Sequence, residues 1–292
     1  MSFKTHYRKI NIDGIEIFYR EAGDSSRPTI LLLHGFPSSS HMYRDLITNL
    51  ADDFHLVAPD YPGFGNSAMP LRTAYRYTFD NLSHTIENFV DAMGLKRFTL
   101  YMHDYGSPVG FRIATRRPGL IEALIIQNAN AYEEGLGPAI DDGKRFWANR
   151  TAETEKAMKQ ALTLEGTMFQ YLHGVNEPEA ISPDAHHYDQ HFLNRPGNSD
   201  IQLDLLYDYL NNIKLYTQWQ KYLREHRPPT LVVWGKNDLF FTAEGALAYK
   251  KDLPDAKVVL LDSGHFALEE YHQQISEYIR SYLFLVQTAS KH

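Results

Sequence analysis

Short, continuously apolar runs alternate with segments of helical spacing over the first 130 residues. A run of aliphatic and aromatic side chains is typical of a strand covered on both faces, and such runs occupy residues 29–33, 55–58, 98–101 and 123–126. Between them, recurring apolar positions predict helices over residues 41–52, over residues 77–93 and over a segment that ends before Pro118. This alternation predicts an α/β fold, a mostly parallel central sheet with helices on both faces.

Further strands are predicted at both ends of the chain. Residues 7–21 alternate polar and apolar side chains around Asp13 and Gly14, which predicts an opening β-hairpin. Apolar runs resume at residues 230–234 and 257–261, and an amphipathic helix is predicted over residues 272–286.

The intervening segment has no buried run. Residues 131–216 contain helix-like stretches rich in Tyr, Asp and His. We therefore expect residues 1–130 and 217–292 to form the core domain, and residues 131–216 to form a helical cap inserted between two late strands. Ligands of such a sheet bind at the carboxyl ends of its strands, here beneath the cap.

Composition and charge narrow the function classes. The chain of 292 residues is 43% hydrophobic and 22% charged, and its net charge of −7 disfavours nucleic acids and anionic membranes as partners. Without cysteine, it has no disulfide framework and no thiolate nucleophile. The first residues lack the apolar core of a signal peptide, and there is no run of about 18 apolar residues. We therefore expect a soluble cytoplasmic protein.

The most informative segment is residues 98–112, where an apolar run meets His103, Asp104, Tyr105 and Gly106 and then turns to helical spacing. This is the layout of a strand-to-helix elbow, a tight turn that lifts one side chain clear of the sheet. The lifted residue is Asp104, and a carboxylate there favours cleavage of alkyl–oxygen or alkyl–halogen bonds. Taken alone, Asp104 could equally cap the following helix.

Two later strand ends favour the catalytic interpretation. Asp238 follows the run at 230–234, and His265 follows the run at 257–261. The order nucleophile, acid, histidine is that of elbow-type hydrolases. We expect His265 to act as the base and Asp238 to orient it.

The loop after residues 29–33 reads His34, Gly35, Phe36, Pro37. In an elbow site, one backbone N–H from this loop and one from the residue after the nucleophile bind the oxyanion. Phe36 and Tyr105 are therefore the predicted donors. The ring of His34 is expected to support the loop and to take no part in the chemistry.

Together these motifs resemble a known family. Residues 34–37, 60–67 and 103–106, with Asp238 and His265, resemble the α/β-hydrolase fold and its aspartate-nucleophile branch of epoxide hydrolases and haloalkane dehalogenases. The resemblance covers nearly the whole chain and is weakest in the cap. It implies a covalent alkyl ester on the aspartate, a small apolar electrophilic substrate, water as the second reactant, and no metal or organic cofactor.

Within the branch, the residues beside the nucleophile resemble epoxide hydrolases, which open epoxides to vicinal diols. Dehalogenases usually hold halide with a Trp after the nucleophile and often an Asn in the loop, where this chain has Tyr105 and Phe36. Haloacid-cleaving relatives need arginines where this chain has Tyr105 and Pro108. Met102 departs from the small residue usual in epoxide hydrolases, so we expect the elbow to be packed differently.

Epoxide opening also needs an acid for the departing oxygen, which the family usually supplies from two cap tyrosines. Tyr171, ahead of Glu177 and Pro178, resembles the first, and Tyr209 resembles the second, with Tyr216 as a rival. Cap tyrosines are also frequent packing residues, so both interpretations stay open.

Three alternatives accompany this hypothesis. The nearest is a haloalkane dehalogenase that uses the same three catalytic residues. A non-catalytic ligand-binding protein on the same fold is the alternative of another class, although retention of the complete triad favours an enzyme. The spacing of His187 and His191, with His186 beside them, would suit a metal, but no cysteine or clear third ligand accompanies them.

Overall fold

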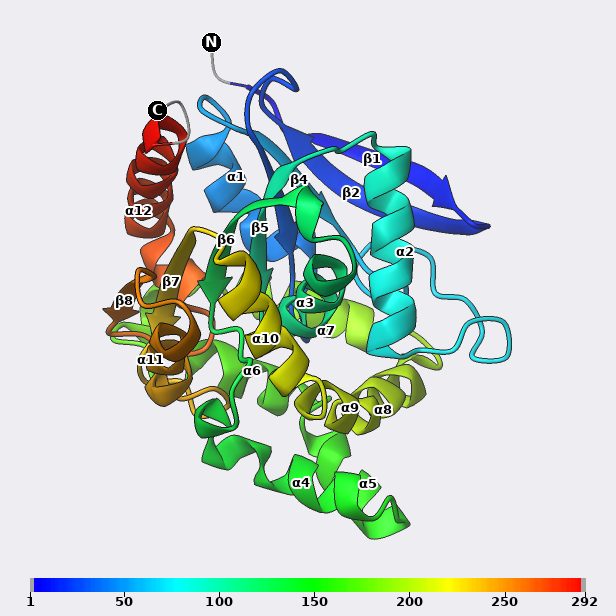
Figure 1. Cartoon of the computed structure of the whole chain (residues 1–292). Helices are drawn as coiled ribbons and strands as arrows, with labels where there is room; N and C mark the ends of the chain where they lie inside the picture. The colour runs from blue at the N-terminus through cyan, green and yellow to red at the C-terminus, as the bar shows by residue number, and fades with distance from the viewer. Residues whose placement is uncertain (1–2, 290–292) are drawn as a thin grey trace.

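The computed structural model describes residues 3–289, which contain an eight-stranded sheet (Figure 1). The strand order is β1-β2-β4-β3-β5-β6-β7-β8. Strand β2 pairs antiparallel with β1 and β4, and the other neighbours pair parallel. The strands are β1 (His6–Ile12), β2 (Ile15–Ala22), β3 (Thr29–Leu33), β4 (His55–Pro59), β5 (Phe98–His103), β6 (Ile121–Gln127), β7 (Thr230–Gly235) and β8 (Lys257–Leu261).

Helices cover both faces of the sheet (Figure 1). One layer consists of α1 (Arg44–Leu50) and α12 (Ala267–Ala289). The other consists of α2 (Phe79–Ala92), α3 (Gly106–Arg116), α10 (Tyr216–His226) and α11 (Ala243–Asp252). Short 3-10 helices occupy Ser40–Tyr43, Pro118–Leu120, Glu133–Gly135, Pro138–Ile140 and Pro178–Ala180.

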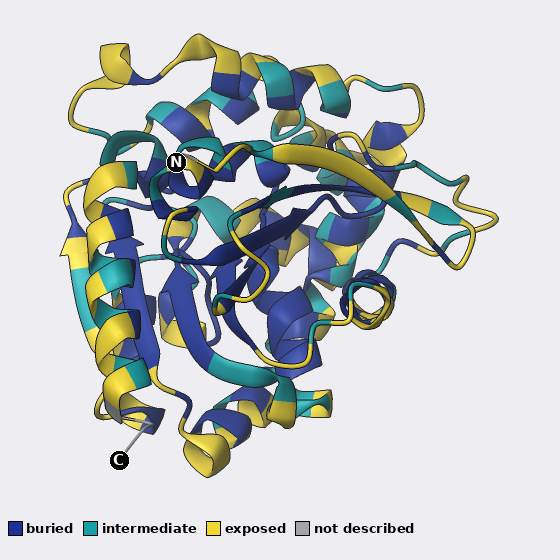
Figure 2. Ribbon diagram, turned by 90° about the horizontal axis from the view of Figure 1, so that it is seen from above, coloured by how far each residue is buried: buried dark blue, intermediate teal, exposed yellow. Residues whose placement is uncertain are grey.

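Alternate residues of the central strands pack against opposite layers. In β3, Leu31 and Leu33 belong to the hydrophobic cluster under α2 and α3, whereas Ile30 and Leu32 belong to the cluster under α1 and α12. In Figure 2 the central strands are buried, and the outward faces of the helices are exposed. Burial on both faces explains why these strands are continuously apolar in the sequence.

The chain between β6 and β7 forms a helical segment over the carboxyl ends of the strands (Figure 1). Its helices are α4 (Asp141–Ala148), α5 (Ala152–Gln160), α6 (Leu164–Leu172), α7 (Pro183–Leu193), α8 (Asn198–Asp208) and α9 (Leu210–Ile213). The next helix, α10, returns to the core and packs against α3 and α11. We call α4–α9 the cap; the domain boundaries at residues 131 and 216 stay a prediction.

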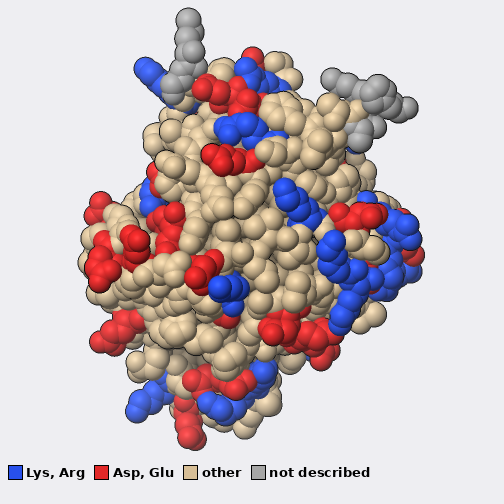
Figure 3. Space-filling model, turned by 90° about the vertical axis from the view of Figure 1, so that its left-hand side faces the viewer, with Lys and Arg blue, Asp and Glu red and all other residues tan. Residues whose placement is uncertain are grey.

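The α/β fold expected from the sequence is confirmed, with two differences in its helices. Helix α12 begins at Ala267, ahead of the predicted start at residue 272. Helix α11 was not predicted, because its buried side consists largely of small residues such as Gly245, Ala246 and Ala248. No helix within residues 3–289 is long and apolar enough to span a membrane. On the face in Figure 3, basic and acidic side chains are interspersed.

Candidate active site

The elbow lies between the end of β5 at His103 and the start of α3 at Gly106. Asp104 has a φ of 46°, in the left-handed region that non-glycine residues rarely adopt. Its backbone N–H donates to the Asn128 carbonyl at 3.3 Å, and its carbonyl accepts from the Ser107 N–H at 2.9 Å. Tyr105 is the N-cap of α3, and no side chain caps that helix. The capping interpretation of Asp104 is therefore wrong.

Two glycines make room for large side chains at the elbow. A Cβ on Gly35 would lie 2.5 Å from the Cβ of Asp104 and 2.7 Å from its Oδ2, so only glycine lets this loop approach the carboxylate. A Cβ on Gly110 would lie 2.4 Å from the Sδ of Met102. The large side chain of Met102 thus fits because Gly110 on α3 has no side chain, and the turn at the elbow is retained.

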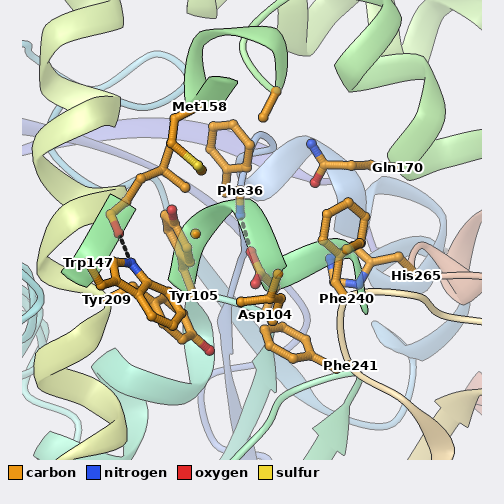
Figure 4. Close-up of a pocket in the computed structure, with 15 residues that line it drawn as sticks. Phe36, Asp104, Tyr105, Trp147, Met158, Gln170, Tyr209, Phe240, Phe241 and His265 are labelled. Carbon is orange, nitrogen blue, oxygen red and sulfur yellow. Dashed lines mark hydrogen bonds between the residues drawn. The ribbon is translucent and has the colours of Figure 1, made fainter. Parts of the chain in front are cut away.

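Backbone N–H groups of Phe36 and Tyr105 interact with the Asp104 carboxylate. The Phe36 N–H donates to Oδ2 at 2.6 Å (Figure 4). Burial raises the pKa of Asp104 to about 6, while His265 and the backbone N–H groups of Phe36 and Tyr105 oppose the rise. The carboxylate is therefore mostly ionised at neutral pH although it is only 6% exposed.

His265 and Asp238 form a buried pair beside this carboxylate. The Nδ1 of His265 lies 2.7 Å from Oδ2 of Asp238, and both residues come from loops that follow β7 and β8. Burial lowers the pKa of His265, but the Asp238 and Asp104 carboxylates outweigh it, so the pKa stands above its ordinary value of 6.5. With Nδ1 held by Asp238, Nε2 is the nitrogen free to accept a proton.

Asn128 is a positioning residue that sequence reasoning missed. It follows β6 directly, has a φ of 43°, and donates from Nδ2 to Oδ2 of Asp238 at 2.8 Å. Its Oδ1 accepts the Gly235 N–H at 2.9 Å, and the Phe240 N–H donates to the other oxygen of Asp238 at 2.7 Å. A signal existed, because Asn128 is a polar residue at the carboxyl end of a buried strand.

A mostly apolar pocket of about 110 Å³ opens over Asp104 (Figure 4). Core and cap both contribute to its wall. The lining residues are Phe36, Asp104, Tyr105, Ala139, Ile140, Gly143, Trp147, Met158, Ala161, Gln170, Leu206, Tyr209, Phe240, Phe241 and His265. The pocket therefore brings Asp104 and His265 together with Tyr209, one of the two predicted cap tyrosines.

Tyr209 is the predicted cap tyrosine that reaches the pocket. Burial, Tyr216 and the Asp104 charge raise its pKa well above 10, so the phenol keeps its proton. The rival, Tyr216, does not line the pocket; its hydroxyl interacts with that of Tyr209 and accepts from Asn130 Nδ2 at 3.3 Å. Tyr216 thus supports Tyr209 from behind.

Tyr171 requires a correction, because it is buried away from the pocket. Its hydroxyl donates to Oδ2 of Asp189 at 2.5 Å, and its ring stacks on Phe266 with centroids 4.0 Å apart. The neighbouring residue, Gln170, lines the pocket in its place. Tyr171 therefore packs between the cap and the core, and it lies outside the pocket that a proton donor must line.

The remaining candidate histidines are His34 in the loop after β3 and the three histidines of α7. His34 supports its loop as expected, since Nε2 accepts the Tyr61 N–H at 3.2 Å and Nδ1 lies 3.0 Å from the Gly35 carbonyl. His186, His187 and His191 lie on α7. Within residues 3–289, no three His, Cys, Asp or Glu side chains are grouped so as to hold a metal ion.

Comparison with known proteins finds relatives over nearly the whole chain. An uncharacterized hydrolase of Saccharomyces cerevisiae is 45% identical over 284 residues, which cover 94% of this chain and 96% of that protein. Epoxide hydrolase 2 of Caenorhabditis elegans is 22% identical over 288 residues, which cover 95% of this chain and 80% of that protein.

A solved structure and a family model complete the comparison. A mutant of the haloalkane dehalogenase DatA from Agrobacterium tumefaciens shares the fold, with a TM-score of 0.80 and 20% identity over 96% of this chain and 97% of that one. A family model described as "alpha/beta hydrolase fold" matches residues 28–271, which include Asp104, Asp238 and His265. The chain belongs to the alpha/beta hydrolase fold family.

Proposed function

We propose that this protein opens epoxides to vicinal diols through a covalent ester on Asp104. The observation that carries the proposal is a carboxylate at the elbow, where most such sites have a serine. It faces an apolar pocket that also holds His265 and the phenol of Tyr209. An apolar wall with a few polar groups suits a small, uncharged electrophile.

In the first step Asp104 Oδ1 attacks an epoxide carbon, because Oδ2 is held by the Phe36 N–H. The carbon–oxygen bond of the ring breaks, and its electron pair stays on the departing oxygen. Tyr209 gives its proton to that oxygen. An ester on Asp104 with a free hydroxyl on the neighbouring carbon results, and Tyr209 becomes a phenolate.

In the second step water hydrolyses the ester. His265 Nε2 removes a proton from water, and the hydroxide attacks the Asp104 carbonyl carbon. Negative charge then develops on Oδ2, the oxygen to which Phe36 N–H donates at 2.6 Å. The position of this N–H supports a role in stabilising that charge. Collapse releases the diol with the proton from His265, and the remaining proton restores Tyr209.

The pocket supports an epoxide better than an alkyl halide. A departing halide needs N–H donors. The indole N–H that lines the pocket, that of Trp147, donates instead to the Leu206 carbonyl at 2.7 Å. The residue after the nucleophile is Tyr105, which has no indole N–H. A departing alkoxide needs a proton, which the phenol of Tyr209 can give.

The test uses the His265→Gln variant and styrene oxide. Attack by Asp104 should proceed while hydrolysis stalls, so the protein should gain the mass of one styrene oxide, and peptide mapping should place it on Asp104. The wild-type protein should form phenylethanediol. The matched control, His265→Gln with Asp104→Asn, should gain no mass.

Two results would contradict the proposal. One is a wild-type protein that forms diol while the His265→Gln variant stays unmodified. The other is steady bromide release from brominated alkanes with no diol from any epoxide, which would make the protein a haloalkane dehalogenase.

A further inference from the structure

The cap wall carries an uncharged polar side chain that this mechanism does not use. Gln170 is only 4% exposed, yet it lines the pocket that holds Asp104, Tyr209 and His265. Figure 4 shows its amide pointing into the cavity. Within residues 3–289 the amide has no hydrogen-bond partner. A polar group that lines an apolar pocket and has no protein partner is available to bind a polar atom of the substrate.

Helix α6 is held so that residue 170 faces the cavity. Thr167 Oγ1 donates to Oε1 of Gln190 at 2.8 Å, and the Tyr171 hydroxyl donates to Asp189 at 2.5 Å. These two contacts, one helical turn apart, bind α6 to α7 on either side of Gln170. The amide is therefore presented by a fixed helix, as a recognition group requires.

The rest of the cap wall is apolar or already satisfied. The Trp147 N–H is bonded to the Leu206 carbonyl. The other lining residues of residues 131–216 are Ala139, Ile140, Gly143, Met158, Ala161 and Leu206, in addition to Tyr209. Gln170 and Tyr209 are thus the groups of this wall that offer a hydrogen to a substrate.

We propose that the Gln170 amide donates a hydrogen bond to the epoxide oxygen as the ring opens, and that Tyr209 alone supplies the proton. This inference rests on the proposed function. A carboxamide N–H donates without giving up its hydrogen at neutral pH. The ring carbon–oxygen bond breaks, the Asp104–carbon bond forms, the proton moves from Tyr209 to the oxygen, and Gln170 is unchanged.

The hydrogen bond from Gln170 should matter more in the transition state than in the bound substrate. Negative charge on the departing oxygen grows as the ring opens, and hydrogen bonds to charged atoms are the stronger ones. An interaction that strengthens during the reaction raises the rate and leaves substrate binding little changed. This separates it from a packing role, which would alter binding as well.

The experiment measures ester formation alone, in the His265→Gln background. Rapid-quench mass spectrometry follows adduct formation against styrene oxide concentration, with and without Gln170→Met. We expect the maximal rate to fall about 10- to 100-fold, with the half-saturating concentration nearly unchanged. Gln170→Leu should give the same pattern, and the control Glu165→Gln, at an exposed position of the same helix outside the pocket, should leave the maximal rate unchanged. Thermal unfolding verifies that each variant is folded.

The possible outcomes separate the two proposals. A maximal rate equal to that of the parent, or an effect confined to the half-saturating concentration, would overturn the role of Gln170 and leave the proposed function standing. A parent His265→Gln protein that forms no ester, although the wild type is active, would overturn both.

Discussion

The core side and the cap side of the pocket are held in different ways. On the core side, Asp104, Asp238 and His265 each follow a strand of one sheet, and backbone N–H groups of Phe36 and Phe240 bind the two carboxylates. On the cap side, Gln170 lies on α6, which side-chain hydrogen bonds join to α7, and Tyr209 lies between α8 and α9.

This difference assigns separate tasks to the two sides. Groups that form and break bonds need positions fixed to within a fraction of an ångström, and backbone hydrogen bonds at strand ends provide them. Groups that determine substrate specificity or assist the leaving group can lie on a more variable segment, as those of the cap do. We therefore expect core substitutions to abolish turnover, and cap substitutions to change rates less.

The largest effect should come from Asp238→Asn on the core side. The amide would keep the space filled but could hold His265 in the wrong tautomer, so diol formation should fall about 10³- to 10⁴-fold. Steady-state turnover of styrene oxide measures this. Asp255→Asn, at an exposed carboxylate before β8, is the control and should have wild-type activity. A loss of less than about tenfold for Asp238→Asn would remove Asp238 from its role.

A smaller effect should come from the pocket tyrosines. Tyr209→Phe removes the proposed proton donor and should slow epoxide opening about 100-fold. Tyr105→Phe is the matched control: its buried hydroxyl has no partner within residues 3–289, so its loss should leave the rate nearly unchanged. Single-turnover ester formation compares them. A larger loss of rate for Tyr105→Phe than for Tyr209→Phe would identify Tyr105 as the proton donor in place of Tyr209.

Lowering the pH should reduce the activity, because it protonates groups on the core side of the pocket. Asp104 must be ionised to attack, and burial raises its pKa to about 6. His265 must be neutral to activate water; burial lowers its pKa, but Asp238 raises it further, to above 6.5. The steady-state rate of diol formation, which includes both steps, should therefore fall as the pH drops through these two pKa values, by up to tenfold per pH unit for each group.

The same titration separates the two groups. In His265→Gln, ester formation should follow only the ionisation of Asp104, whose pKa should lie above that in the wild type because His265 no longer opposes the effect of burial. Ester formation that is independent of pH between 5 and 8 would show that the Asp104 carboxylate is not the titrating nucleophile.

The positions of the core-side residues could be predicted from the sequence, because the apolar runs locate the strands and the order of the strands locates their ends. Asp104, Asp238 and His265 each follow an apolar run, and parallel strands bring their carboxyl ends to one edge. Asn128 obeys the same rule but was missed, because its role is to bind Asp238 through an amide that no catalytic motif requires.

The sequence could not predict which individual cap residues face the pocket. Successive helical residues point about 100° apart, so an error of one position exchanges Tyr171, which binds Asp189, for Gln170, which faces the pocket. The apolar spacing of α6 does not reveal which side faces the substrate. That is settled by contacts with α7, such as Thr167 to Gln190, between residues distant in the sequence.

The smallest effect concerns the stability of the cap. Asp189 on α7 is 1% exposed, and its Oδ1 has no hydrogen-bond partner within residues 3–289. Burial raises its pKa to about 7, although the hydroxyls of Tyr171 and Ser38 oppose the rise. The folded state therefore binds this proton more tightly than the unfolded chain, whose pKa is about 3.9. The contribution of Asp189 to the free energy of unfolding is therefore fully present at low pH, and it is lost as the pH rises from about 4 to about 7.

Asp189→Asn should consequently stabilise the protein at pH 8 and not at pH 4. The pKa difference corresponds to at most about 4 kcal/mol, and the unpaired amide atom costs part of it, so we expect a gain of about 2 kcal/mol at pH 8. Urea unfolding of wild type and variant at both pH values measures it. Asp184→Asn, an exposed position on the same helix, is the control and should show no such dependence on pH. An equal shift at both pH values would mean that Asp189 is ionised in the folded protein throughout, and that its carboxylate carries no penalty of burial in the cap.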